Sequence, residues 1–482
     1  MKRNKLAVAC ALALGVSGAS YGQSTAPTSA EVEQLKAQMA EMQKQMVAMK
    51  QQLERQGAAP RTGETVTAAP AAQTEQKTAP GGETTAQQSP LSTRIGGTDV
   101  TLYGHVDVSA DNVDNGKERI SQVSSNLSYL GVRGSHNLGS ADLKATFQIE
   151  TLANVSNTPT ETSGLASRNS FVGLASKRAG ALMFGKFDTP YKRATAAMDP
   201  FSVTIADYNS IMGNTGGDLR AEFDPRLPHA VFWDSPQWSG FSLNALYSPH
   251  QKLSDLTNAD NYAFPQGEPV CSGASPRGSG STSGATNVCD DGAFKNAWSV
   301  ALNYDAGPLL VTAAYERHSA TNRTSDTGGV TADESAAKAG ASLHTGPNRF
   351  SAIIEKFYRN GGIDPSVNER ARNGYYLSDV LEIGYGNELM AAWAHAGKTP
   401  GGPDFMTVDD KANMYALGAR HRFDKQTNVY FVGVLLRNGE GAHYALGPSG
   451  HGVPVASPRD DNGNTIPGKT IKGVSVGAEY NF

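Results

Sequence analysis

The sequence predicts a closed transmembrane β-barrel of sixteen antiparallel strands, preceded by a short coiled-coil helix and a disordered linker. Apolar and polar residues alternate over segments of about ten residues, and the connections between these segments are short and long in turn. After the N-terminus, no stretch has the roughly 18 apolar residues of a membrane-spanning helix. The formal net charge of −4 over 482 residues gives no reason to expect a nucleic-acid partner.

Residues 1–22 are predicted to be a secretory signal peptide. A basic start at Lys2 and Arg3 precedes an apolar run over residues 6–16, and small residues end the segment at Gly22. The mature chain is therefore expected to be exported from the cytoplasm.

The segment 23–56 is predicted to form a periplasmic coiled coil. Its apolar residues over 32–53 are spaced alternately by three and four positions, which is a heptad pattern. Methionine packs at such a seam but specifies partners weakly, so this helix is expected to associate because the remainder of the chain does. The seam residues are Val32, Leu35, Met39, Met42, Met46, Met49 and Leu53.

Residues 57–96 follow as an Ala/Pro/Thr/Gln-rich stretch with almost no large apolar side chains. Such a composition cannot bury a core, so the stretch is predicted to be a disordered linker.

From residue 97 to residue 482 the period changes to two, as in strands. In ADLKATFQIE (141–150) the odd-numbered positions are apolar and the even-numbered ones, which include Lys144, are polar. The same parity places Arg420 and Arg422 on the polar face of a later strand. A soluble sandwich also alternates, but charges on the polar face and alternating short and long connections favour a membrane barrel.

Sixteen strand candidates run from 98–110 to 471–482. Every strand edge must be paired in a bilayer, so the sheet is expected to close, and a ring of this size is too wide for side chains to fill. The interior is therefore predicted to hold water.

Two cysteines remain after removal of the signal peptide, Cys271 and Cys289, both in a Gly/Ser-rich loop. An even number of cysteines in an exported chain favours a structural disulfide. No residues nearby have the spacing of metal ligands, so neither a metal nor a cofactor is expected.

Several segments resemble the trimeric sixteen-stranded porins of Gram-negative outer membranes. They are VTLYGHVDVS, SYLGVRGSHNLGSADLKATFQIE, SRNSFVGLASKRAGALMFGKFDTPY, VFWDSPQWSGFSLNALYS and the terminal GAEYNF, and they occur in the expected order. The resemblance implies a homotrimer in the outer membrane, in contact with lipid. It also implies that the terminal aromatic residues, Tyr480 and Phe482, are read by the barrel-insertion machinery.

The resemblance further implies that the loop after the fifth strand, residues 188–229, folds into the barrel as a constriction. Its acidic candidates for that role are Asp199, Asp207, Asp218 and Glu222.

The resemblance implies basic groups on the opposite wall, and Arg168 occupies one of those positions. His105 stands where a lysine or another polar residue often lies, and Arg133 keeps a basic group on the same face as Gly131. Tyr129 and Phe232 stand where the family often has arginines, which thins this basic ladder.

The expected function is passive diffusion of small hydrophilic solutes and ions. A channel selective for one anion, carboxylate or sugar is the alternative, with Arg420, Arg422 and Lys144 as a candidate anion path. An adhesin or a tether that binds peptidoglycan through the coiled coil is a third possibility. An enzyme is not expected, because the sequence has no serine-centred elbow and its histidines lie on separate segments.

Overall fold

The computed structural model describes much of the predicted barrel region. The described residues are 91–139, 142–153, 155–156, 164–213, 223–249, 296–322, 331–359, 371–398, 409, 411–442, 444–447, 458 and 466–482. The predicted signal peptide, the coiled coil, most of the linker and both cysteines lie outside them. No helix within the described residues is long and apolar enough to cross a bilayer.

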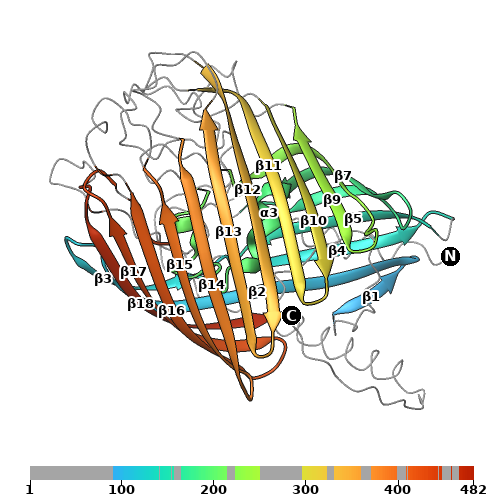
Figure 1. The fold of residues 1–482 in the computed structure, drawn as a ribbon. Helices are drawn as coiled ribbons and strands as arrows, with labels where there is room; N and C mark the ends of the chain where they lie inside the picture. The colour runs from blue at the N-terminus through green and yellow to red at the C-terminus, as the bar shows by residue number, and fades with distance from the viewer. Residues whose placement is uncertain are drawn as a thin grey trace, which may run out of the picture. The chain divides into compact units, whose positions relative to one another are not determined.

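Long antiparallel strands make up nearly all of the described structure (Figure 1). Their bounds are β1 Ser92–Ile95, β2 Thr98–Asp114, β3 Arg119–Ser125, β4 Tyr129–Asn137, β5 Leu143–Leu152, β6 Ser170–Ser176, β7 Gly180–Asp188, β8 Arg226–Asp234, β9 Phe241–Ser248, β10 Asn296–Ala306, β11 Leu309–Asn322, β12 Thr331–Thr345, β13 Asn348–Arg359, β14 Asn373–Gly384, β15 Asn387–Ala396, β16 Ala412–Arg422, β17 Thr427–Asn438 and β18 Thr470–Asn481. Strand β1 falls within the predicted linker and pairs with the start of β2, so ordered structure begins earlier than the sequence predicts.

The sheet closes on itself because β18 pairs with β2, from Lys472 opposite Asp114 to Asn481 opposite His105. Eighteen strand segments are described, but β3 and β4 follow one another along β2 and fill one position, and β1 is an extra segment before β2. The ring therefore has sixteen positions (18 − 1 − 1), and the predicted barrel is confirmed.

The two faces of each strand follow the predicted parity. On β5, Leu143 and Ile149 are 36% and 44% exposed on the outside, whereas Gln148 and Glu150 are buried on the inside. On β16, Leu417 points outward, and Arg420, three positions along, points inward. A lipid-facing band and a polar interior result from this alternation.

The described connections are short at one end of the barrel and, with one exception, long at the other. The exception is the tight turn Asn115–Glu118 between β2 and β3, where the Asn115 side chain accepts hydrogen bonds from the backbone N–H groups of Lys117 and Glu118. At the short-turn end, the backbone of Phe482 exchanges two 3.0 Å hydrogen bonds with Gly104, so Phe482 is tied to β2.

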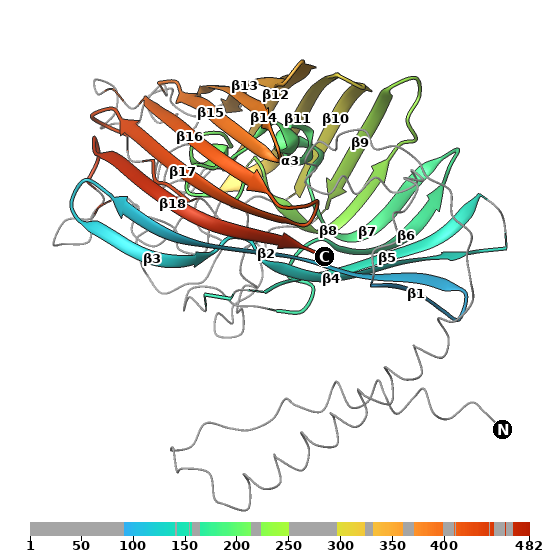
Figure 2. The same cartoon turned by 90° about the horizontal axis from the view of Figure 1, so that it is seen from below.

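The segment after β7 enters the ring instead of remaining at its rim (Figure 2). It contains a short helix, α3 (Pro190–Thr195), and two 3-10 turns, η1 (Ala196–Met198) and η2 (Tyr208–Ser210). Thr189 caps α3 by accepting a hydrogen bond from the Lys192 N–H group. We call residues 189–213 the inner loop.

The inner loop packs against the inner faces of β10–β18, which we call the covered wall. Its apolar side chains fit over inward glycines: a Cβ on Gly340 would lie 2.7 Å from the Met198 sulfur, and one on Gly418 would lie 2.8 Å from the Phe201 ring. A buried cluster joins the loop to β13–β18. Apart from Val113 near the end of β2, the described inner faces of β2, β4 and β5 contribute no residue to this cluster, and we call these faces the open wall.

Candidate functional site

The open wall brings together the three basic residues that the sequence singled out. His105 on β2 and Tyr129 on β4 are directly opposite in the register, and their rings stack with centroids 5.4 Å apart. The Arg168 guanidinium lies 4.6 Å from the centre of the same tyrosine ring. Tyr129, noted in the sequence as a substitute for a family arginine, therefore contacts both His105 and Arg168.

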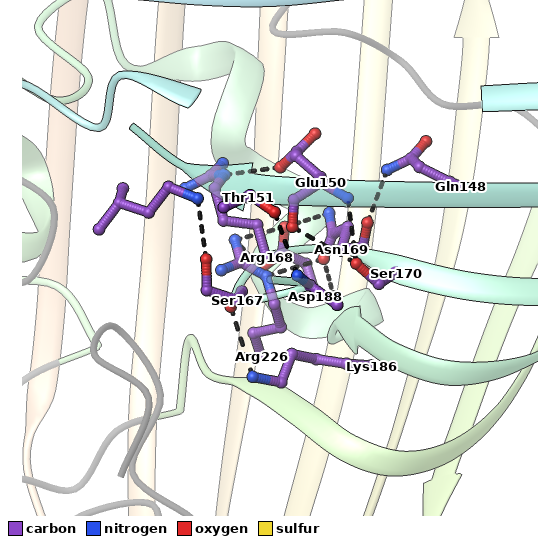
Figure 3. Close-up of polar contacts among 12 residues, drawn as sticks. Gln148, Glu150, Thr151, Ser167, Arg168, Asn169, Ser170, Lys186, Asp188 and Arg226 are labelled. Atoms are coloured by element: carbon purple, nitrogen blue, oxygen red, sulfur yellow. Dashed lines mark hydrogen bonds and ion pairs between the residues drawn. The ribbon is translucent and has the colours of Figure 1, made fainter. Parts of the chain in front are cut away.

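A buried carboxylate extends this group along the wall (Figure 3). Arg168 Nε is 2.6 Å from Glu150 Oε1, and the Tyr103 hydroxyl donates to Glu150 Oε2 at 3.0 Å. The Arg133 guanidinium lies 4.9 Å from the Tyr103 ring. Glu150 thus offsets one of the positive charges and fixes the direction of the Arg168 side chain.

The root of the inner loop is held by a second set of charges, which the sequence analysis missed. Asp188, at the end of β7, lies 3.2 Å from Lys192 Nζ and 3.1 Å from an Arg226 guanidinium nitrogen. The Asn169 side chain links them, because its amide donates to Asp188 and its oxygen accepts from Arg226 Nε (Figure 3). These contacts join the end of β7 to the start of β8, the two strands between which the inner loop lies.

A third pair lies next to this root. Arg193 on α3 forms two parallel 2.9 Å hydrogen bonds with the Asp234 carboxylate, and its guanidinium is 4.9 Å from the Phe187 ring. Phe187 stacks on Phe232 with 4.1 Å between ring centres. Where the family often has an arginine at the position of Phe232, this chain places an arginine from the inner loop above the aromatic pair.

The described loop acids have a different environment from the water-facing one expected of a filter. Asp199 accepts hydrogen bonds from the Phe201 N–H group and from the Tyr376 hydroxyl on the covered wall, and Asp207 accepts from the backbone of Val203 and Asn209. Both are only 6% exposed.

Burial and the nearby Asp199 carboxylate raise the pKa of Asp207 to about 7. Both acids shape the loop from within. Asp218 and Glu222 lie outside the described residues.

The candidate anion path on β16 also contacts the loop. Arg420 donates to the Pro200 carbonyl at 2.9 Å and lies 3.4 Å from Glu388, and Arg422 lies 2.7 Å from the same carboxylate. Lys144 points inward on the open wall, opposite Asn137 in the register. Arg420 therefore attaches the loop to the covered wall, Arg422 pairs with Glu388 on the neighbouring strand, and Lys144 stands apart from both.

Charged side chains inside the barrel differ in how much surface they leave to water. Lys192 and Arg193 keep 28% and 23% of their side-chain surface exposed, whereas Asp234 keeps 4% and Glu150 keeps 7%. Among the described residues, no group of three or more His, Cys, Asp or Glu side chains is placed to hold a metal ion. The partly exposed cations Lys192 and Arg193 therefore lie in the lumen beside buried acids, an arrangement suited to the passage of charged solutes.

Comparison with known proteins agrees with this architecture. The family model described as Gram-negative porin matches residues 65–441. An outer membrane porin protein of Bordetella pertussis is 26% identical over 383 residues, which cover 71% of this chain and 89% of the relative. The major outer membrane protein P.IA of Neisseria meningitidis serogroup A is 32% identical over 145 residues, 30% of this chain and 34% of that one.

Solved structures share the fold. An anion-selective porin from Comamonas acidovorans aligns with a TM-score of 0.58 at 20% identity, covering 80% of this chain and 100% of its own. OmpT of Vibrio cholerae aligns with a TM-score of 0.51 at 14% identity, covering 81% and 100%. The closed ring, the loop folded into it and the family match over most of the chain together show that this chain belongs to the Gram-negative porins of the outer membrane.

Proposed function

We propose that this porin passes small hydrophilic solutes and ions by passive diffusion, with a preference for anions where the inner loop faces the open wall. The observation that carries the proposal is the unequal burial of charge. The side chains of Lys192 and Arg193 are 28% and 23% exposed, whereas Asp199 and Asp207 are buried within the loop.

The physical basis is the field of fixed charges in a narrow opening. Charges on protein walls that exclude water act more strongly than in bulk solution, and salt screens them over about 8 Å at physiological ionic strength. Fixed cations raise the local concentration of anions and repel cations. The Comamonas porin of the same fold is anion-selective, and the charges of this chain point in the same direction.

Planar-bilayer recording in a salt gradient tests the preference. The wild-type reversal potential is expected to have the sign of anion selectivity, and Lys192→Gln combined with Arg193→Gln should move it toward zero. Lys356→Gln is the matched control, because this lysine lies on the outer face of β13. A cation-selective wild-type channel, or an equal shift in the control, would contradict the proposal.

A channel selective for one small anion or carboxylate is the second candidate. It is favoured by His105 and Arg168, which both contact the Tyr129 ring and so bring two basic groups together at one level of the open wall. A solute that reduces the chloride current at micromolar to millimolar concentration would support this reading. A current unaffected by every candidate solute would leave general diffusion.

We also propose that the protein is a homotrimer, supported by the predicted heptads over 32–53. A trimer form has been solved for Vibrio cholerae OmpT, which shares the fold. Light scattering of the detergent complex should give three copies of the chain. The same measurement on a variant lacking residues 23–56 shows whether the barrel alone sustains the assembly. A monomeric full-length chain would contradict the proposal.

A further inference from the structure

The connection that follows β17 packs against the inside of the barrel. It lies at the end where the connections are long, and this end faces the outside of the cell because short turns in this class of barrel face the periplasm. We call its described residues 439–442 and 444–446 the extracellular strap. Three of its apolar side chains are at most 2% exposed, and they are Ala442, Tyr444 and Leu446.

The extracellular strap shares one buried apolar cluster with the far end of the inner loop. Tyr444 and Leu446 of the strap belong to the same cluster as Ile211 and Met212 of the loop. A segment at the mouth of the barrel is therefore packed in one core with the segment that narrows the lumen.

A buried arginine connects the strap and the inner loop. Arg372 lies just before β14, and its side chain is fully buried. The guanidinium donates a hydrogen bond to the backbone carbonyl of Ile211, and it lies 5.7 Å from the centre of the Tyr444 ring. The Phe357 ring is 4.7 Å from the same guanidinium. Arg372 thus contacts the inner loop, the strap and β13 at once.

Glu355 extends these contacts from the inner face of β13. Its carboxylate lies 4.0 Å from the Arg372 guanidinium and accepts hydrogen bonds of 3.0 and 3.2 Å from the Gly213 N–H group. The Tyr191 hydroxyl also donates to it, at 3.0 Å. Tyr191 lies near the start of the inner loop and Gly213 at its end, so one carboxylate holds both.

The rings beside Arg372 matter because its charge is out of water. Within the described residues, Nε and Nη1 of Arg372 form no hydrogen bond. A cation removed from water gains more from an aromatic face than an exposed one does. The Tyr444 ring is therefore expected to stabilise the position of Arg372, and with it the position of Glu355.

The strap is itself attached to the rim of the barrel. The side-chain oxygen of Asn438, the last residue of β17, accepts a hydrogen bond from the Tyr444 N–H group, and its amide donates to the carbonyls of Tyr444 and Lys469, all at 3.0 Å. The Gly439 N–H group donates to the Lys411 carbonyl at 2.7 Å. These bonds keep Tyr444 against Arg372.

We propose that Arg372 is a positioning residue that couples the extracellular strap to the constriction. The strap keeps Arg372 and Glu355 in place through the Tyr444 ring, and these two residues hold the inner loop. Displacement of the strap at the cell surface therefore loosens the inner loop. The consequence for selectivity rests on the proposed function, in which ions pass Lys192 and Arg193 on this loop.

Hydrogen exchange of the backbone amides in residues 189–213 tests the coupling without any measurement of ion flow. It is followed by mass spectrometry on the full-length protein in detergent. Tyr444→Leu removes the ring and should accelerate exchange of the inner loop about fivefold, equivalent to about 1 kcal/mol. Asn438→Ala releases the strap from the rim and should act in the same direction, whereas Tyr444→Phe keeps the ring and should exchange as wild type does.

The matched control is Glu440→Gln, because the side chain of Glu440 is exposed on the same strap. Unchanged exchange in Tyr444→Leu or in Asn438→Ala, or an equal acceleration in the control, would overturn the proposal. Heat-modified migration in a semi-native gel shows that each variant is folded.

A second comparison tests whether the effect passes through the buried pair. Arg372→Met/Glu355→Gln removes both charges, so neither is left buried without its partner. Adding Tyr444→Leu to this variant should accelerate exchange no further, whereas independent effects would multiply. A further fivefold acceleration would show that the strap holds the loop without Arg372, and would overturn its positioning role.

The reversal potential in a salt gradient separates this coupling from the proposed anion preference. In Tyr444→Leu it should move toward zero, because the loop that carries Lys192 and Arg193 is held less firmly. A wild-type channel without anion preference would contradict the proposed function, and the exchange measurements would still decide whether the strap holds the loop.

Discussion

The covered wall and the open wall are built from the same alternating strands but present opposite inner surfaces. Inward positions of the covered wall include Gly340, Gly418 and small alanines such as Ala394, over which the inner loop packs. Inward positions of the open wall include Tyr129 and Arg133, which are too large and polar for such a contact. The loop packs where glycine and alanine leave room on the covered wall, between larger inward side chains such as Tyr376 and Arg420 that form hydrogen bonds with it.

Charged side chains also have different contacts on the two walls. On the covered wall Lys338 pairs with Asp224 at 2.6 Å, and the Tyr191 hydroxyl donates to Glu355 at 3.0 Å, so charges there attach the loop to the strands. On the open wall Arg168 stacks on Tyr129 and keeps part of its surface exposed. We therefore expect the ion pairs between loop and wall to fix the constriction, and the stacked cations to influence which ions pass it.

The largest expected effect comes from breaking the root of the inner loop. Asp188→Ala removes the carboxylate that lies 3.1 Å from Arg226, whose side chain is 5% exposed, and loss of one member of a buried ion pair costs about 3–5 kcal/mol. The loop should detach in part, giving a noisier single-channel current and new protease cleavage within 189–213. A quiet channel with wild-type conductance would show that the apolar contacts suffice to hold the loop.

The next effect tests the covered wall by adding a side chain at one of the inward glycines over which the inner loop packs. Gly418→Val would force a side chain against the Phe201 ring, and such overpacking costs about 1–3 kcal/mol. The temperature at which the barrel unfolds in a semi-native gel should fall, and the loop should shift toward the open wall with reduced conductance. Gly433→Val on β17 is the matched control, because the nearest atom to its Cβ would be 4.0 Å away. Equal behaviour of the two variants would contradict the interpretation that the inner loop needs glycine at position 418.

A smaller effect is expected from the open wall. Tyr129→Leu removes the ring that contacts Arg168 and His105, and a cation–π contact of this kind contributes about 1 kcal/mol to the position of the guanidinium. The anion preference in a salt gradient should weaken without loss of conductance, whereas Tyr129→Phe should retain it. Identical selectivity in all three proteins would mean that Glu150 alone positions Arg168.

Much of the barrel was predictable because strand parity is a local property. The inward direction of Arg420 and Arg422 follows from counting by two, and closure follows from the need to pair every strand edge. The end of the linker was placed too late, because the four residues of β1 (Ser92–Ile95) gain their structure from pairing with β2.

The site was harder to predict because the orientation of a loop carboxylate depends on the fold of the loop. Asp199 and Asp207 each accept a hydrogen bond from the N–H group two residues later, as aspartate does in a local turn. An aspartate that is followed by proline, as Asp199 is, carries a sequence signal for such a turn. The contacts Asp188–Arg226 and Arg193–Asp234 join residues 38 and 41 positions apart and leave no local pattern.

The smallest expected effect concerns pH, and it acts through the inner loop on the covered wall and not through the open wall. Because burial and Asp199 raise the pKa of Asp207 to about 7, above its ordinary value of 3.8, the loop contact of this side chain favours the protonated form. That contribution is fully present below about pH 4 and is lost as the pH rises through about 7. Between pH 6 and pH 8 the free energy that holds the loop in place should fall by about 1 kcal/mol. The current noise from the inner loop should therefore increase over this range. Asp207→Asn should remove this dependence on pH even though it loses one backbone hydrogen bond, since the amide does not titrate. If the dependence persists in the variant, the titrating group is not Asp207 and this interpretation of the inner loop is wrong.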